Sequence, residues 1–161
     1  MSSTPRSGLL GRRPASRDPL VRVTSSVFGV AAAAHVAWGL RVTVPGVDAE
    51  RMAEAVAGSG ELPGPAACFA VAGALTAAAA LVVGVPASRP ALVRAGRGGV
   101  ALALGGRAAL GLTGHTDLVA PGELTDRFRR WDRRLYTPLC LALAAGAARA
   151  IALDAHSRVE I

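Results

Sequence analysis

Five side chains of chemically useful types stand out in an otherwise apolar chain: His35, Trp38, Arg107, Asp132 and Tyr136. Imidazole and phenol groups exchange hydrogen bonds, and a guanidinium binds carboxylates and phosphates. Arg107 is the most informative of them, because residues 98–114 contain no other charged residue. A charge in such a run is costly and normally faces a bundle interior or a water-filled cavity.

Several chemistries find no support in the sequence. It contains no HExxH, GxSxG or phosphate-loop motif, so no catalytic set is expected. The apolar runs contain no Asp or Glu, which argues against a carboxylate-driven proton antiporter. A bis-His haem needs a second histidine in the membrane, and His115 and His156 lie outside the runs. Cys68 and Cys140 form no CxxC motif, and we expect no metal and no cofactor.

Composition indicates a membrane protein of one domain. Among 161 residues, 52% are hydrophobic and 18% are charged, and the apolar residues gather in four long runs. All 18 basic residues are Arg, giving a net charge of +7. These arginines bracket the apolar runs and accompany no nucleic-acid recognition motif. They therefore indicate membrane topology, and we expect no nucleic-acid partner.

The four runs predict an all-α fold, an integral membrane up-and-down four-helix bundle with spans at about 21–41, 64–86, 91–113 and 135–153. The second run is the clearest, because residues 64–87 carry no charge. Pro65 suits a first helical turn, and Pro86 ends the run. The short turn that follows predicts an antiparallel hairpin of the second and third spans. A cleaved signal peptide is the alternative for the first run, and the length of residues 23–40 favours a span.

The remaining segments are polar. We expect a disordered basic tail over 1–19, the transmembrane domain over 20–155 and a short tail over 156–161. In the first connection, Asp48 is placed to cap a short amphipathic helix that Gly58 ends; a loop packed on the bundle is the alternative. In the second, Phe128, Trp131 and Leu135 share one face and predict an interfacial helix.

The distribution of arginines predicts the orientation. Ten lie on the side of the two termini and seven on the side of the two longer connections. The positive-inside rule then places both termini in the cytoplasm of a multi-pass protein of the cell membrane. In this orientation Arg94 and Arg97 lie in the first turns of the third span, where they can snorkel to the headgroups.

Tracing depth along each span places His35, Cys68, Arg107, Tyr136 and Cys140 in the same, outer half of the membrane. We expect Arg107 to point into the bundle and upward, within hydrogen-bonding reach of Tyr136, His35 or Asp132.

Each of these residues also has a purely structural explanation. His35 can donate a hydrogen bond between helices, and Trp38 and Tyr136 can belong to the aromatic belt. Cys68 and Cys140 can be small buried hydrophobes with free thiols. Arg107 can form a salt bridge to Asp132 or Asp117 in place of a contact with a lipid headgroup or other ligand.

Three stretches resemble a known family. AAAHVAWGL in the first span, the Arg-bearing third span and FRRWDRRLYTPLCLAL at the entrance to the fourth occur in this order. Over roughly residues 20–153 they resemble the small four-helix bacterial membrane proteins of domain-of-unknown-function family 3995. Asp132, Arg134, Tyr136, Pro138 and Cys140 carry the most specific part of the resemblance, and His35 with Trp38 supports it. The resemblance implies four spans and no assigned activity.

Three functional hypotheses follow. The preferred one is a non-enzymatic membrane protein with a small polar site, built from His35, Trp38, Arg107, Asp132 and Tyr136, that binds a lipid headgroup or small anion. The second is a membrane-embedded redox or quinone-linked protein. The third is a structural subunit that docks on other membrane subunits, or on copies of itself, through small-residue helix faces. The lipid bilayer is the partner common to all three.

Overall fold

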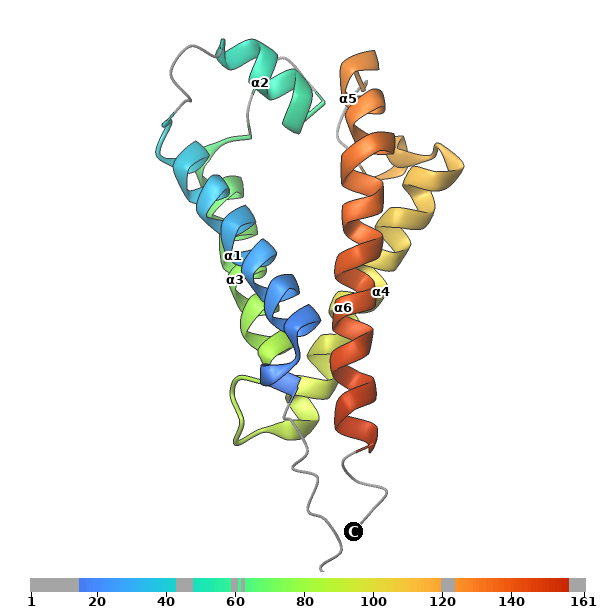
Figure 1. The fold of residues 1–161 in the computed structure, drawn as a ribbon. Coiled ribbons are helices and arrows are strands. Elements are labelled where there is room, and N and C mark those ends of the chain that lie inside the picture. Colours follow the sequence, from blue (N-terminus) through green and yellow to red (C-terminus); the bar gives the residue numbers. More distant parts are fainter. Residues whose placement is uncertain (1–14, 43–47, 59–60, 62, 120–123, 157–161) are drawn as a thin grey trace, which may run out of the picture.

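The computed structural model describes residues 15–42, 48–58, 61, 63–119 and 124–156. The regular elements in these ranges are all helical, which confirms the all-α prediction. Four long helices form two side-by-side pairs that meet at one end of the molecule and diverge toward the other (Figure 1). Most of the predicted N-terminal tail and the last five residues lie outside the described residues.

The first pair consists of α1 (Pro19–Gly39) and α3 (Pro65–Val83). Asp18 caps α1, since its carboxylate accepts hydrogen bonds from the backbone N–H groups of the first turn at 3.0 and 3.3 Å. Pro65 occupies the first turn of α3, as predicted, and Gly84 ends that helix with φ 98°, a conformation that favours glycine. The hydroxyl of Ser25 donates across the pair to the carbonyl oxygen of Ala79 at 3.1 Å.

The second pair consists of α4 (Pro90–Thr113) and α6 (Thr137–His156). Gly111 allows their close approach, because an added Cβ would overlap the Thr137 hydroxyl. The predicted hairpin of α3 and α4 exists only in part. The two helices meet near their short turn, but α3 packs mainly along α1 and α4 mainly along α6 (Figure 1).

Two short helices cover the open end of the molecule (Figure 1). Asp48 caps α2 (Ala49–Val56), and Gly58 follows it with φ 77°, as the sequence predicts. Met52 and Ala53 are buried, and Gly58 lies against Phe128 of α5 (Asp126–Trp131). Protein therefore covers part of the apolar face of α2, and its membrane-surface location stays a prediction.

The helix predicted from Phe128, Trp131 and Leu135 is present as α5, but it is not separate from the last span, and its interfacial location stays a prediction. α5 continues through a π-helical turn, Asp132–Tyr136, directly into α6. In this turn the Thr137 backbone N–H donates to the Asp132 carbonyl oxygen, five residues back. Pro138, two residues after the end of the turn, has no N–H to continue the α-helical ladder. The predicted aromatic face is also divided, because Phe128 is buried whereas Trp131 is 46% exposed.

Three helical segments are long and apolar enough to cross a membrane: Pro19–Gly39, Pro65–Val83 and Asp126–His156. α4 is not among these candidates. It has the length, but Arg94, Arg97 and Arg107 lower its mean hydropathy.

The hydrophobic core lies at the end where the helix pairs meet. Phe28 of α1, Val82 of α3 and Ala147 and Ala150 of α6 are among its buried members. Gly146 lets α6 approach α1 there, since an added Cβ would overlap the Thr24 hydroxyl. This tight contact at one end accounts for the divergence of the pairs at the other.

Candidate functional site

A cleft of about 640 Å³ lies between the two helix pairs at their diverging end. One wall is formed by α1 and the other by α4, the π turn and α6. Residues of α2, its flanking loops and α5 line the outer end. Most lining residues are apolar. The side chains that bring polar atoms to the walls are His35, Trp38, Glu61, Arg107, Thr116 and Tyr136.

Arg107 is held by a buried carboxylate. Its Nη2 donates to Oδ1 of Asp132 at 2.5 Å, and the other carboxylate oxygen accepts a hydrogen bond from the Thr116 hydroxyl at 2.7 Å. Asp132 is only 3% exposed, so it depends on these two donors. The predicted pairing of Arg107 with Asp132 is confirmed. Asp132 stands behind Arg107 and does not line the cleft itself.

The second terminal nitrogen of Arg107, Nη1, is buried and has no hydrogen-bond partner among the described residues. An unsatisfied buried N–H group costs free energy, and a charged one costs more. Arg107 also lines the cleft. The guanidinium therefore has a hydrogen-bond donor that neither Asp132 nor the rest of the described chain uses.

His35 and Trp38 lie on the same face of α1, as their spacing predicts. Their rings meet edge to face, with centroids 4.9 Å apart. Nδ1 of His35 lies 2.8 Å from the carbonyl oxygen of Ala31, one turn earlier in the same helix. The expected bond of His35 to another helix is therefore absent from the described contacts.

Tyr136 has a structural contact that the sequence did not predict. Its hydroxyl donates to the carbonyl oxygen of Ala55 in α2 at 2.9 Å, and its ring packs on Phe128 with centroids 5.8 Å apart. The hydroxyl thus fastens α2 across the end of the cleft and does not contact Arg107. Four of the five predicted site residues (His35, Trp38, Arg107, Tyr136) line the cleft, and the fifth anchors one of them.

The two cysteines are free thiols, as predicted. Cys68 is buried and lies near the Pro63 carbonyl oxygen, at 3.4 Å. Cys140 is partly buried on α6. Among the described residues, no group of three or more His, Cys, Asp or Glu side chains is arranged to hold a metal ion.

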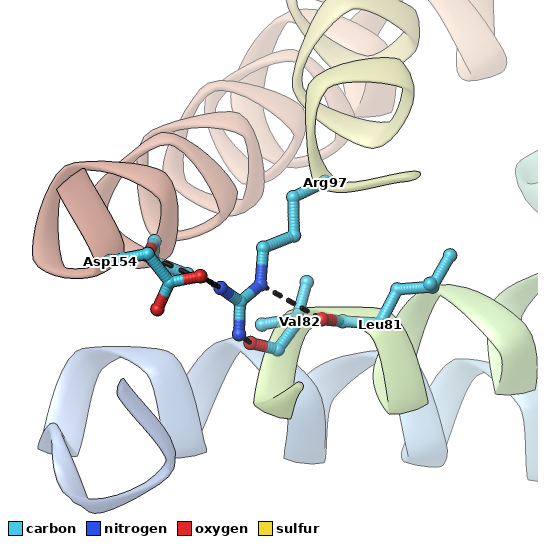
Figure 2. A network of polar contacts seen from close by, with 5 residues as sticks. Leu81, Val82, Arg97 and Asp154 are labelled. Atoms are coloured by element: carbon cyan, nitrogen blue, oxygen red, sulfur yellow. Dashed lines mark hydrogen bonds and ion pairs between the residues drawn. The ribbon is translucent and has the colours of Figure 1, made fainter. Parts of the chain in front are cut away.

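Sequence reasoning missed a second buried charge, Arg97. This side chain does not reach outward to headgroups, as expected; it is 1% exposed and turns into the bundle (Figure 2). Its Nε donates to the Leu81 carbonyl oxygen at 2.9 Å and its Nη2 to that of Val82 at 3.0 Å. Its Nη1 forms an ion pair with Asp154 and lies 3.3 Å from the Ala150 carbonyl oxygen. A signal was available, since Asp154 is the acid nearest the predicted end of the last span.

Comparisons with known proteins give one match. A family model described as "Protein of unknown function (DUF3995)" matches residues 28–147, which include every candidate site residue. Neither the curated proteins nor the solved structures that were searched contain a match.

Proposed function

The chain belongs to the DUF3995 family, and we propose that it is a non-enzymatic membrane protein with four spans whose cleft binds the headgroup of an anionic lipid at Arg107. A small free anion presents the same chemistry to the guanidinium. The main supporting observation is that Arg107 lines an apolar cleft while its buried Nη1 has no hydrogen-bond partner among the described residues.

The hydrogen bonds and ion pairs that its arginines form inside the protein support α4 as the fourth span. Arg97 is bonded to three carbonyl oxygens and Asp154, and Arg107 is paired with Asp132. The mean hydropathy of α4 overstates the free-energy cost of placing this helix in a membrane, because its charged side chains have partners within the protein. Elsewhere α4 exposes apolar side chains that suit acyl chains, with Leu102 78% and Leu112 69% exposed.

The arrangement of the described ends supports an even number of spans. The start of α1, the turn between α3 and α4 and the end of α6 lie at one end of the molecule (Figure 1). The short helices α2 and α5 lie at the other. The arginine distribution favours the cytoplasm for the first of these ends, and with this orientation the proposed site lies in the outer half of a cell membrane.

The size and lining of the cleft favour an amphiphile. Ligand sites typically have volumes of roughly 300–1,000 Å³ and combine apolar walls with a few convergent polar groups. Here the walls suit an acyl chain, and Arg107 supplies the charged donor for a phosphate oxygen. Exposed arginines of α5 and the π turn, among them Arg129 and Arg133, add positive charge at the same end.

Native mass spectrometry of the purified protein with phosphatidylglycerol or phosphatidylcholine tests this proposal. We expect preferential binding of the anionic lipid. Arg107→Gln should weaken that binding at least about tenfold, because a hydrogen bond to a charged group is lost. Arg149→Gln is the matched control; Arg149 pairs with Asp18 at 3.4 Å at the opposite end and is 53% exposed. Equal binding of both lipids, or an unchanged affinity in Arg107→Gln, would refute the lipid site.

Because Arg107→Gln leaves Asp132 without its cation, a second variant is needed. The double change Arg107→Gln and Asp132→Asn removes both charges together while keeping amide groups that hydrogen bond to each other. It should fold and still fail to select the anionic lipid. Retained selectivity in the folded double variant would contradict the assignment of Arg107 as the headgroup donor.

A further inference from the structure

The hydrogen bond of His35 fixes which of its ring nitrogens carries a hydrogen. Nδ1 lies 2.8 Å from the Ala31 carbonyl oxygen, and a carbonyl oxygen only accepts hydrogen bonds. Nδ1 is therefore the donor. In the neutral ring Nε2 is then an acceptor, and none of the described residues donates to it.

His35 and Arg107 therefore have opposite hydrogen-bonding requirements for a ligand: one accepts a hydrogen bond and the other donates one. Both residues line the same cleft, and among the described residues Arg107 Nη1 has no acceptor and His35 Nε2 has no donor. The Trp38 ring against His35 restricts the position of the imidazole. A fully ionised phosphate ester without a hydroxyl satisfies only Arg107, whereas a phosphate ester with a nearby hydroxyl satisfies both.

The charge and polarity of the cleft walls favour one kind of ligand group as the hydrogen-bond donor to His35 Nε2. An ammonium group would have to leave water for a largely apolar cleft that already contains the Arg107 guanidinium, which is costly. A hydroxyl is neutral and is desolvated more easily. At pH 7 a phosphate monoester is largely a dianion, which has no P–OH donor, and its second negative charge would also have to leave water for this largely apolar cleft.

We propose that the cleft selects a lipid whose headgroup is a phosphodiester bearing a free hydroxyl, of the phosphatidylglycerol type. The phosphate accepts from Arg107, and the headgroup hydroxyl donates to Nε2 of His35. This inference rests on the proposed function and adds His35 as the residue that determines headgroup specificity.

Trp38 gives a direct measurement, because its side chain lines the cleft. The chain has two tryptophans, so Trp131→Phe leaves Trp38 as the sole indole fluorophore. Short-chain phosphatidylglycerol, phosphatidic acid and phosphatidylethanolamine are titrated separately into this background protein in detergent. We expect phosphatidylglycerol to bind at least about fivefold more tightly than the other two, the effect of one additional hydrogen bond. Water-soluble glycerophosphoglycerol should bind at least about tenfold more weakly than the lipid, because it has no acyl chains to bury.

Two variants test the role of His35 independently of lipid binding itself. His35→Phe should remove the preference for phosphatidylglycerol and leave the affinity for phosphatidic acid unchanged. His156→Phe is a matched control, since its Nδ1 bonds the Ala152 carbonyl oxygen at 2.7 Å in the same way but outside the cleft. It should change neither affinity. Far-UV circular dichroism and retained phosphatidic acid binding establish that the His35 variant is folded.

The outcomes are distinct. If Arg107→Gln weakens both anionic lipids but His35→Phe alters neither, the lipid site stands and the role of His35 is refuted. The same conclusion follows if phosphatidic acid or phosphatidylethanolamine binds as tightly as phosphatidylglycerol. Glycerophosphoglycerol that binds as tightly as the lipid would overturn the lipid as the ligand. If no anionic lipid binds, the proposed function itself fails.

Discussion

Replacing Arg107 by Leu tests whether the buried acid at the cleft depends on its cation. Asp132 is 3% exposed and has two side-chain donors, Arg107 and Thr116. The substitution leaves the carboxylate with one neutral hydroxyl. Stranding one member of a buried ion pair costs about 3–5 kcal/mol in soluble proteins. The Arg107 side chain is 24% exposed, so water partly relieves the loss, and we expect a value near the lower limit, about 3 kcal/mol.

The assay is the free energy of unfolding in mixed micelles, titrated with a denaturing detergent and followed by circular dichroism. Arg107→Lys should fall between wild type and Arg107→Leu, because an ammonium keeps the charge but loses the planar fork. The double variant Arg107→Leu and Asp132→Leu should recover much of the lost stability, since neither charge is left unpaired. Arg149→Leu removes an exposed pair and should cost less than about 1 kcal/mol.

A loss below about 1 kcal/mol for Arg107→Leu would refute this reasoning, because Asp132 would then behave like a solvated surface acid. Failure of the double variant to exceed the stability of the single one would refute it independently. The cost would then arise from lost packing of the Arg107 stem and not from the stranded charge.

Three further predictions concern packing, topology and the thiols. Gly111→Ala should destabilise the protein by about 1–3 kcal/mol in the same assay, whereas Gly105→Ala, with nothing within 4 Å of its added Cβ, should be neutral or slightly stabilising. Reporter fusions at residues 55, 92, 120 and 161 should place 92 and 161 in the cytoplasm and the other two outside, and activity of a periplasm-only reporter at 92 would reverse the orientation. Cys68 and Cys140 should both alkylate in denatured, unreduced protein, and a mass lower by two hydrogens would instead show a disulfide.

Much of the helical fold could be predicted because its signals are local. Apolar runs, Pro65 at a first turn and Asp48 as a cap each depend on neighbouring residues only. The pairing of α1 with α3 and of α4 with α6 could not be read in this way. It depends on close contacts such as that of Gly111 with Thr137, residues far apart in the sequence.

The sequence predicted the membrane depth of the candidate site residues but not the contacts that they form. Spacing along each span placed His35, Arg107 and Tyr136 in the same half of the membrane, and the structure brings all three to one cleft. It could not show that the Tyr136 hydroxyl bonds the Ala55 carbonyl oxygen, because the position of α2 is set by tertiary packing. The π turn was equally hidden, since it is one residue of extra winding within a pattern that otherwise fits an α-helix.

The two arginines of α4 that pair with acids, Arg97 and Arg107, lie on either side of an uncharged central stretch of that helix. Arg97 and Arg107 are ten residues apart, about 15 Å at the helical rise, whereas their partners Asp154 and Asp132 are 22 residues apart, about 33 Å. Side-chain reach must supply much of the difference of about 18 Å, so the two stems extend toward opposite ends of the molecule. The charges are thereby moved away from the middle of α4, where residues 98–106 are uncharged. Each arginine is also held by an acid of the same continuous helical segment, α5 through α6. A helix that mean hydropathy alone rejects as a span thus keeps its central turns apolar and its charges paired at two depths.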